Sequence, residues 1–287
     1  MDRAPPLFFL GRWWHLKGKF LLIPVLAALF LLAAPSLPAG AEIFKSATGA
    51  TFYVWSDALV WAEGRVDPWV TVVRLPNGSL TTVPVERWAW DADCEAWSPG
   101  LAGRLDALLE KLVRAGLDTA HLRGLRVYLL PAYSLRLPGS VPAAGEAVAG
   151  VHWAGEGALA VAGLTGEQEW VFLHELGHYL AEKVLSAPGY GWDRANALGW
   201  EYLALRKYPE ERALDTWSQA RLSWKDRAAE WFAEDFAYWV AGKAEKWDLR
   251  DNYRAACDPP DEKVLGWFDG LFAKSLSKYE LRYTGVF

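Results

Sequence analysis

The sequence is poor in the residues from which metal sites and nucleic-acid interfaces are usually built. Its 287 residues include only 5 histidines and 2 cysteines. Basic residues form no run outside the extreme N-terminus, and the formal net charge is −5. A nucleic-acid partner is therefore not expected, because general nucleic-acid binders carry a basic patch or stripe.

Long hydrophobic runs are also absent. The apolar run from Phe20 to Ala34 is shorter than the about 20 residues that a membrane-spanning helix needs. Small residues at Ala39 and Ala41 follow it, and four basic residues precede it: Arg3, Arg12, Lys17 and Lys19. This order is typical of a secretory signal peptide, so residues 1–41 are predicted to be removed on export. An uncleaved anchor, which would be the chain's one contact with a membrane, is the alternative. Either way the protein is expected to be secreted or otherwise extracytoplasmic.

The two cysteines, Cys94 and Cys257, suit an exported chain. An even number of cysteines outside the cytoplasm favours a disulfide, here Cys94–Cys257, and two free buried thiols are the alternative. Neither cysteine has a second cysteine or a histidine at metal-ligand spacing, which argues against a cysteine-type zinc site.

The rest of the chain alternates strand and helix patterns, which predicts an α+β fold. Residues 42–95 are expected to be β-rich, with a hairpin that turns at Asn77-Gly78. They are either the opening of the main sheet or a small accessory module. Residues 96–287 are expected to form one catalytic domain, with a small mixed sheet and a mostly helical C-terminal half. The expected strands are 51–55, 70–75, 80–83, 125–130, 149–153 and 158–162, and the expected helices are 101–115, 196–207, 211–222, 226–240 and 261–277.

The clearest chemical signal is the His-Glu-x-x-His pattern at residues 174–178, on a helix predicted between Thr165 and Ala187. Histidines four residues apart lie on one face of a helix, so His174 and His178 can supply two ligands to one zinc ion. Glu175 between them can reach a water bound to that ion. Gly177 weakens the helix and suggests that another element packs closely there. A pair of surface or core histidines on an amphipathic helix is the plainer alternative.

A catalytic zinc ion needs a third protein ligand. No histidine follows His178, and although His121 or His152 could ligate from upstream, a downstream carboxylate is the better candidate. Glu230 and Glu234 share one face of a predicted helix, where they should repel each other unless a cation or donor lies between them. We assign Glu230 to zinc, and Glu234 to accepting the free N–H of a ligating histidine. The reverse assignment and an ordinary acidic helix face are the alternatives.

These two motifs together resemble those of the gluzincin metallopeptidases. The stretch Glu230-Trp231-Phe232-Ala233-Glu234-Asp235-Phe236 is similar to one in the catalytic domain of anthrax toxin lethal factor and related bacterial peptidases. The resemblance implies a zincin-like fold, whose edge strand before the metal helix binds substrate. Here that strand is either 150–153 or 158–162. In this family a tyrosine shortly before the second motif stabilises the oxyanion, but this chain has Ser223-Trp224-Lys225 there. The residues that could take its place are His152, Tyr190, Tyr202 and Tyr238.

The sequence thus predicts an exported zinc-dependent metalloendopeptidase that acts on proteins or peptides. Zinc held by His174, His178 and Glu230 would lower the pKa of its water, and Glu175 would take the proton as that water attacks the scissile carbonyl. A non-catalytic exported binding protein that keeps the fold is the alternative. The sequence does not indicate an oligomeric state.

Overall fold

The computed structural model of the protein describes residues 43–74, 80–84, 88, 92–137, 148–185, 197–209, 212 and 221–272. All of these residues belong to one compact unit, Gly40–Phe287. The expected signal peptide at residues 1–41 lies outside the described residues. Of the helices in the described ranges, none has the length and apolar character required to cross a membrane.

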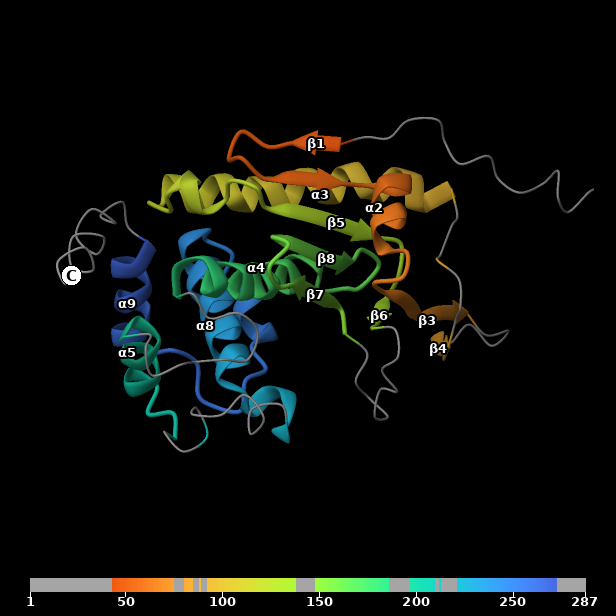
Figure 1. The fold of residues 1–287 in the computed structure, drawn as a ribbon. Helices are drawn as coiled ribbons and strands as arrows, with labels where there is room; N and C mark the ends of the chain where they lie inside the picture. The colour runs from red at the N-terminus through yellow and green to blue at the C-terminus, as the bar shows by residue number, and fades with distance from the viewer. Residues whose placement is uncertain are drawn as a thin grey trace, which may run out of the picture. The chain divides into compact units, whose positions relative to one another are not determined.

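Five strands form the main sheet in the order β1-β2-β5-β8-β7 (Figure 1). The central strands β2, β5 and β8 run parallel, whereas β1 and β7 are antiparallel to their neighbours and form the two edges. Of the two candidate edge strands near the metal helix, β7 is therefore the one at the edge. The bounds are β1 (Ile43–Lys45), β2 (Thr51–Tyr53), β5 (Arg126–Leu130), β7 (Gly150–Trp153) and β8 (Ala158–Ala162).

Beyond β8 the described elements are all helical, so the predicted helical C-terminal half is confirmed over the described ranges. Strands and helices together make a mixed structure, as the predicted α+β class requires. The predicted helix 211–222 falls mostly outside the described residues. The helices are α2 (Trp55–Ala62), α3 (Ala92–Arg114), α4 (Gln168–Leu185), α5 (Ala197–Leu205), α8 (Ala228–Lys243) and α9 (Glu262–Phe272), with 3₁₀ turns η1 (Thr119–His121), η2 (Trp224–Asp226) and η3 (Trp247–Asn252).

The main sheet has a hydrophobic core on each face. Strand side chains alternate between faces, so Val127 and Leu129 of β5 join the core that contains residues of α3, α4, α8 and α9. Tyr128 and Leu130 point to the opposite face, where they pack with α2. Helix α4 packs against the sheet on one side and against α8 on another. His174 and Glu175 of the His-Glu-x-x-His pattern are buried in this position.

The N-terminal part of the described chain belongs to the sheet. Strand β2 pairs in parallel with β5, which joins the predicted β-rich segment to the strands that follow α3. The predicted hairpin is confirmed as β3 (Asp67–Arg74) and β4 (Leu80–Pro84), although its turn at residues 75–79 lies outside the described residues. The hairpin forms a second sheet with β6 (Ser134–Arg136), in a region where the sequence predicts only a loop.

Two predictions for the N-terminal segment are wrong in detail. The expected strand 51–55 ends at Tyr53, and helix α2 follows, because Ala58, Trp61 and Ala62 recur at helical spacing and form one buried face. Helix α3 begins at Ala92, more than two turns before the expected start at Leu101, and contains Pro99.

The predicted Cys94–Cys257 disulfide is not formed in the structure. Cys257 carries a free thiol, and the side chain of Cys94 is not among those described. The Cys257 Sγ instead accepts a hydrogen bond from Arg206 Nη2 at 2.7 Å and lies 3.2 Å from the Tyr253 hydroxyl. Burial raises the pKa of this thiol, so it stays protonated and weakly reactive at neutral pH.

Candidate metal centre

The candidate centre lies where α4 and α8 approach each other most closely. A Cβ atom added at Gly177 would lie 2.8 Å from the Cα of Ala233, which is closer than two carbon atoms can pack. Glycine is therefore required at this turn for steric reasons, as its presence in a helix suggests. The contact places the histidine face of α4 against the acidic face of α8.

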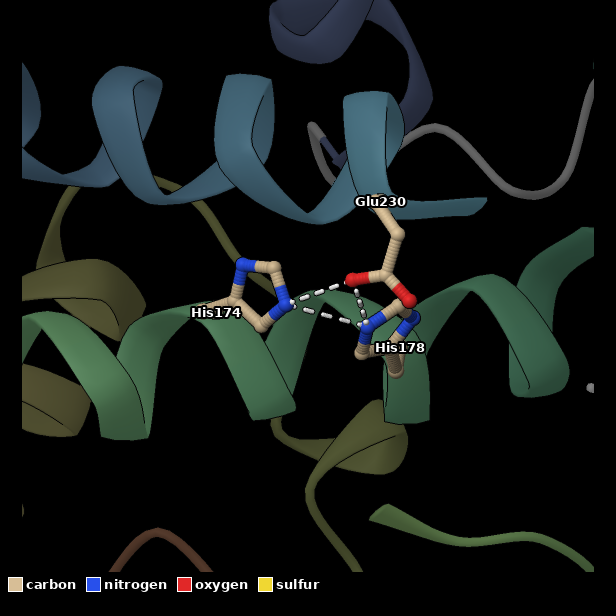
Figure 2. Close-up of side chains that lie close together, drawn as sticks. All are labelled: His174, His178 and Glu230. Carbon is tan, nitrogen blue, oxygen red and sulfur yellow. Dashed lines mark hydrogen bonds and ion pairs between the residues drawn. The ribbon is translucent and has the colours of Figure 1, made fainter. Parts of the chain in front are cut away.

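Three side chains from these helices converge on one point. The Nε2 of His174 lies 3.1 Å from the Nε2 of His178 and 3.1 Å from the Oε2 of Glu230, and the latter two atoms are 3.3 Å apart. Figure 2 shows Glu230 reaching down from α8 to the two rings on α4. Within the described part of the chain, these are the residues that form a group able to hold a metal ion.

The donor atoms fit a zinc ion. A tetrahedral ion about 2.1 Å from each ligand would keep the ligand atoms roughly 3.4 Å apart, close to the observed separations. Two imidazole nitrogens that face each other at 3.1 Å repel unless a proton or cation lies between them. Two imidazoles and a carboxylate make three protein ligands, the number typical of catalytic zinc sites, whereas structural zinc sites usually have four.

The charges in this group depend strongly on one another because the group is buried. Burial alone would raise the pKa of Glu230, but the neighbouring His178 and His174 outweigh this and hold it well below its ordinary value. Burial would likewise lower the pKa of His174, but hydrogen bonds to Glu230 and Glu234 hold it well above its ordinary value. Without a metal ion, a proton therefore neutralises the charge that a cation would otherwise balance.

Glu234 contacts the other nitrogen of His174. Its Oε1 lies 3.0 Å from the His174 Nδ1 and accepts a hydrogen bond from Trp170 Nε1 at 3.3 Å, and its Oε2 accepts one from the backbone N–H of Arg254 at 2.6 Å. A carboxylate at this nitrogen fixes the ring orientation and keeps the Nε2 lone pair directed at the metal position. The sequence analysis missed the contributions of Trp170 and Arg254.

Glu175 is buried beside the edge strand β7. A Cβ at Gly150 would lie 2.7 Å from the Cγ of Glu175 and 2.9 Å from its Oε1, so the glycine makes room for this side chain. Burial raises the pKa of Glu175, against the lowering effects of His174, His178 and a hydrogen bond to the backbone of His152. A carboxyl group with a raised pKa is a more effective proton acceptor and donor near neutral pH than an exposed one.

The other described histidines, His121 and His152, are not in the metal group. His152, on β7, has its ring nearly parallel to that of His178, with centroids 6.4 Å apart, and its Nε2 lies 3.0 Å from the Oε2 of Glu182. Burial and the nearby His178 lower the pKa of His152 to about 3, so its ring is neutral. His121 instead packs edge-on against Phe272.

The aromatic residues that could stabilise the oxyanion lie in different parts of the structure. The Tyr202 hydroxyl donates a hydrogen bond to Asp235 at 2.7 Å, and Tyr238 packs under the guanidinium of Arg250. Tyr190 lies outside the described residues. Trp224, which stands where the family pattern has its tyrosine, has its ring 5.6 Å from that of His174 and is partly exposed. It therefore borders the metal group but offers a donor only through its indole nitrogen.

Comparison with known proteins does not place the chain in a family: no family model, curated protein or solved structure matches it.

Proposed function

We propose that this chain is an exported zinc-dependent metalloendopeptidase with a zincin-like fold. The observation that carries the proposal is the buried group His174, His178 and Glu230, with Glu175 beside it on the same helix. The sheet supports it, because an antiparallel edge strand next to the metal helix is the arrangement that the resemblance to gluzincins implies.

Each residue of the centre has a role in this proposal. His174, His178 and Glu230 hold the ion, and Glu234 orients the His174 ring through its Nδ1. When bound, zinc supplies a Lewis acid that polarises the scissile carbonyl and makes water a stronger nucleophile. Glu175 accepts a proton from the attacking water and passes it to the leaving amine, which its raised pKa favours.

The free edge of β7 is the proposed binding surface for the peptide. Within the described residues the strand paired with β7 is β8, so the other side of β7 can offer main-chain groups to an incoming extended chain, apart from the His152 N–H that bonds Glu175. Pairing through main-chain hydrogen bonds gives affinity with little dependence on the substrate's sequence. Proteins and peptides in extended conformation are therefore the expected substrates.

The test combines metal analysis with cleavage of a peptide library by the purified chain, with and without a chelator. We expect about one zinc ion per chain and cleavage that the chelator abolishes. The Glu175→Gln variant should keep its zinc and lose hydrolysis by a factor of at least 10², because general acid–base groups contribute about that much or more. Glu201→Gln, an exposed glutamate on α5, is the matched control and should cleave normally.

A Glu175→Gln variant that cleaves as fast as the wild type would overturn the mechanism. A wild-type protein that binds zinc but cleaves nothing would favour a non-catalytic binding protein, and a protein that binds no zinc would overturn both.

A further inference from the structure

Asp235 is a fully buried carboxyl group next to the metal centre that the proposed reaction does not use. It follows Glu234 in α8, and none of its surface is exposed. It accepts hydrogen bonds from the hydroxyls of Tyr202 at 2.7 Å and Tyr253 at 2.8 Å, and its Oδ2 lies 3.0 Å from the Nε of Arg206. Tyr202 lies on α5, Arg206 directly follows that helix, and Tyr253 directly follows η3.

The same partners hold residues 253–258 in place. Arg206 Nη2 donates to the Cys257 Sγ at 2.7 Å and to the carbonyl oxygen of Asp258 at 2.6 Å. Tyr253 lies at the start of the segment and is tied to Asp235 by its hydroxyl. Asp235 and Arg206 together therefore fix both ends of this short segment against α8.

The segment in turn contacts the metal centre through one hydrogen bond. The backbone N–H of Arg254 donates to the Oε2 of Glu234 at 2.6 Å, while the Oε1 of the same carboxylate lies 3.0 Å from the His174 Nδ1. A continuous series of contacts thus runs from Asp235 through Tyr253 and Arg254 to Glu234, and from there to a candidate metal ligand.

A role in stability alone does not explain this arrangement well. Burying an ion pair costs desolvation energy that its attraction often fails to recover. Burial raises the pKa of Asp235 to about 6, although Arg206 and the two tyrosines lower it, so desolvation is the larger effect. Because a buried ion pair is weak evidence for a stabilising role, the contacts that this carboxyl group makes are the better guide to its function.

We propose that Asp235 is a positioning residue for the metal centre: it holds residues 253–258 where the Arg254 N–H fixes Glu234, and thereby fixes the ring of His174. This inference rests on the proposed function insofar as the ion bound there is zinc. It adds that the affinity for the ion depends on a residue that touches neither the ion nor its ligands.

The experiment measures zinc affinity and amide hydrogen exchange in the full chain. Asp235→Asn should weaken zinc binding about 10-fold or more, in the range that partners of metal ligands contribute. In the metal-free protein it should also speed exchange at the Arg254 amide. Asp269→Asn is the matched control, because Asp269 also bonds α8, through Trp239 and Lys243, but does not contact the centre. It should leave both quantities unchanged.

A double-mutant cycle separates positioning from general destabilisation. In a Glu234→Gln background, Asp235→Asn should change zinc affinity by less than about two-fold, because the path through Glu234 is already broken. A merely structural effect would weaken binding equally in both backgrounds. If Asp235→Asn does not fold, Tyr253→Phe removes one hydroxyl of the same network and should give a smaller effect with the same pattern.

Unchanged zinc affinity or unchanged Arg254 exchange in a folded Asp235→Asn protein would overturn the inference, as would equal losses in the two backgrounds. A wild-type chain that binds no zinc would overturn the proposed function instead, and exchange at Arg254 would then decide alone whether Asp235 holds this segment.

Discussion

Glu230 and Glu234 differ in what they touch, although both are buried glutamates on one face of α8. The Oε2 of Glu230 lies 3.1 and 3.3 Å from the two Nε2 atoms, whereas the histidine nitrogen that Glu234 contacts is the Nδ1 of His174. Glu230→Ala should therefore remove a ligand and lower zinc affinity by more than 10²-fold. Glu234→Ala should lower it by about 10- to 100-fold, as for other partners of metal ligands.

Competition with a calibrated chelator would measure both affinities. Equal losses would show that the two glutamates share the ion, and a larger loss for Glu234→Ala would reverse the assignment.

These residues could be predicted from the sequence because the members of each pair are close together along the chain. His174, His178, Glu230 and Glu234 occur in two i, i+4 pairs, and a helix places such pairs on one face wherever it lies. Trp170, which bonds the same carboxylate as His174, has no such signature, since tryptophans are common in this chain and nothing in the sequence distinguishes this one. Arg254 acts through its backbone N–H, a group that every residue but proline carries, so only the fold could reveal it.

Gly150 provides a second prediction at the scale of single residues. A methyl group there would lie 2.6 Å from Val171 Cγ1 and 2.7 Å from the Cγ of Glu175, so Gly150→Ala should displace the Glu175 side chain. Cleavage should fall by a factor of 10 or more, because small misplacements of a catalytic group are costly. Zinc affinity should change little, since the atoms nearest to the added methyl group belong to Val171 and Glu175 and not to a proposed ligand. Equal losses in cleavage and zinc affinity would mean that the substitution disturbs the whole centre.

Among the elements, the packing of α4 on α8 decides whether the centre forms. Gly177→Ala would force the helices apart, since its Cβ would lie 2.8 Å from Ala233 Cα and 3.2 Å from the Ala233 carbonyl oxygen. Overpacking of this kind costs about 1–3 kcal/mol of unfolding free energy. Zinc affinity should fall as well, because the helices carry different ligands.

The matched control for Gly177→Ala is Gly103→Ala in α3, where an added Cβ meets nothing within 4 Å. That variant should be neutral or more stable by up to about 1 kcal/mol, the usual gain from alanine in a helix. Denaturant unfolding of the metal-free proteins would measure both. A Gly177→Ala protein as stable as Gly103→Ala would show that the interface adjusts.

Helices and strands were predicted best where apolar residues repeat over many positions, and worst where the repeat spans only a few residues. The helices α4 and α8 repeat buried residues over many positions, and the hairpin β3–β4 is marked by Asn77-Gly78 between two strand-like runs. In contrast, α2 shows a single helical repeat of Ala58, Trp61 and Ala62, which the strand-like residues before it obscure. The edge strand could have been chosen from composition: every residue of β8 is apolar and buried, as in a central strand, whereas β7 contains His152 and is only partly buried.

At the scale of the whole molecule, the proposed zinc ion and a proton would compete for one buried position that joins two helices. In the metal-free protein, the raised pKa of His174 contributes stability that is present below its unfolded value of about 6.5 and lost as pH rises through the folded value. The lowered pKa of Glu230 contributes stability that is present above its ordinary value of 4.5 and lost as pH falls through the folded value. The proton between them therefore holds the metal-free centre together best in mildly acidic solution.

Zinc must displace that proton, since a ligating imidazole is neutral. Raising the pH from 6 to 8 lowers the concentration of the competing proton and should strengthen zinc binding, by up to 10-fold per pH unit for each proton released. Zinc at a fixed free concentration should then raise the melting temperature more at pH 8 than at pH 6, because stabilisation grows with the logarithm of the ratio of free zinc to its dissociation constant. Thermal unfolding in zinc buffers at both pH values would measure this. Glu230→Ala, which lacks the third ligand, should show little zinc-dependent stabilisation at either pH. If zinc raised the melting temperature of the wild type equally at both pH values, His174 would hold no proton for zinc to displace.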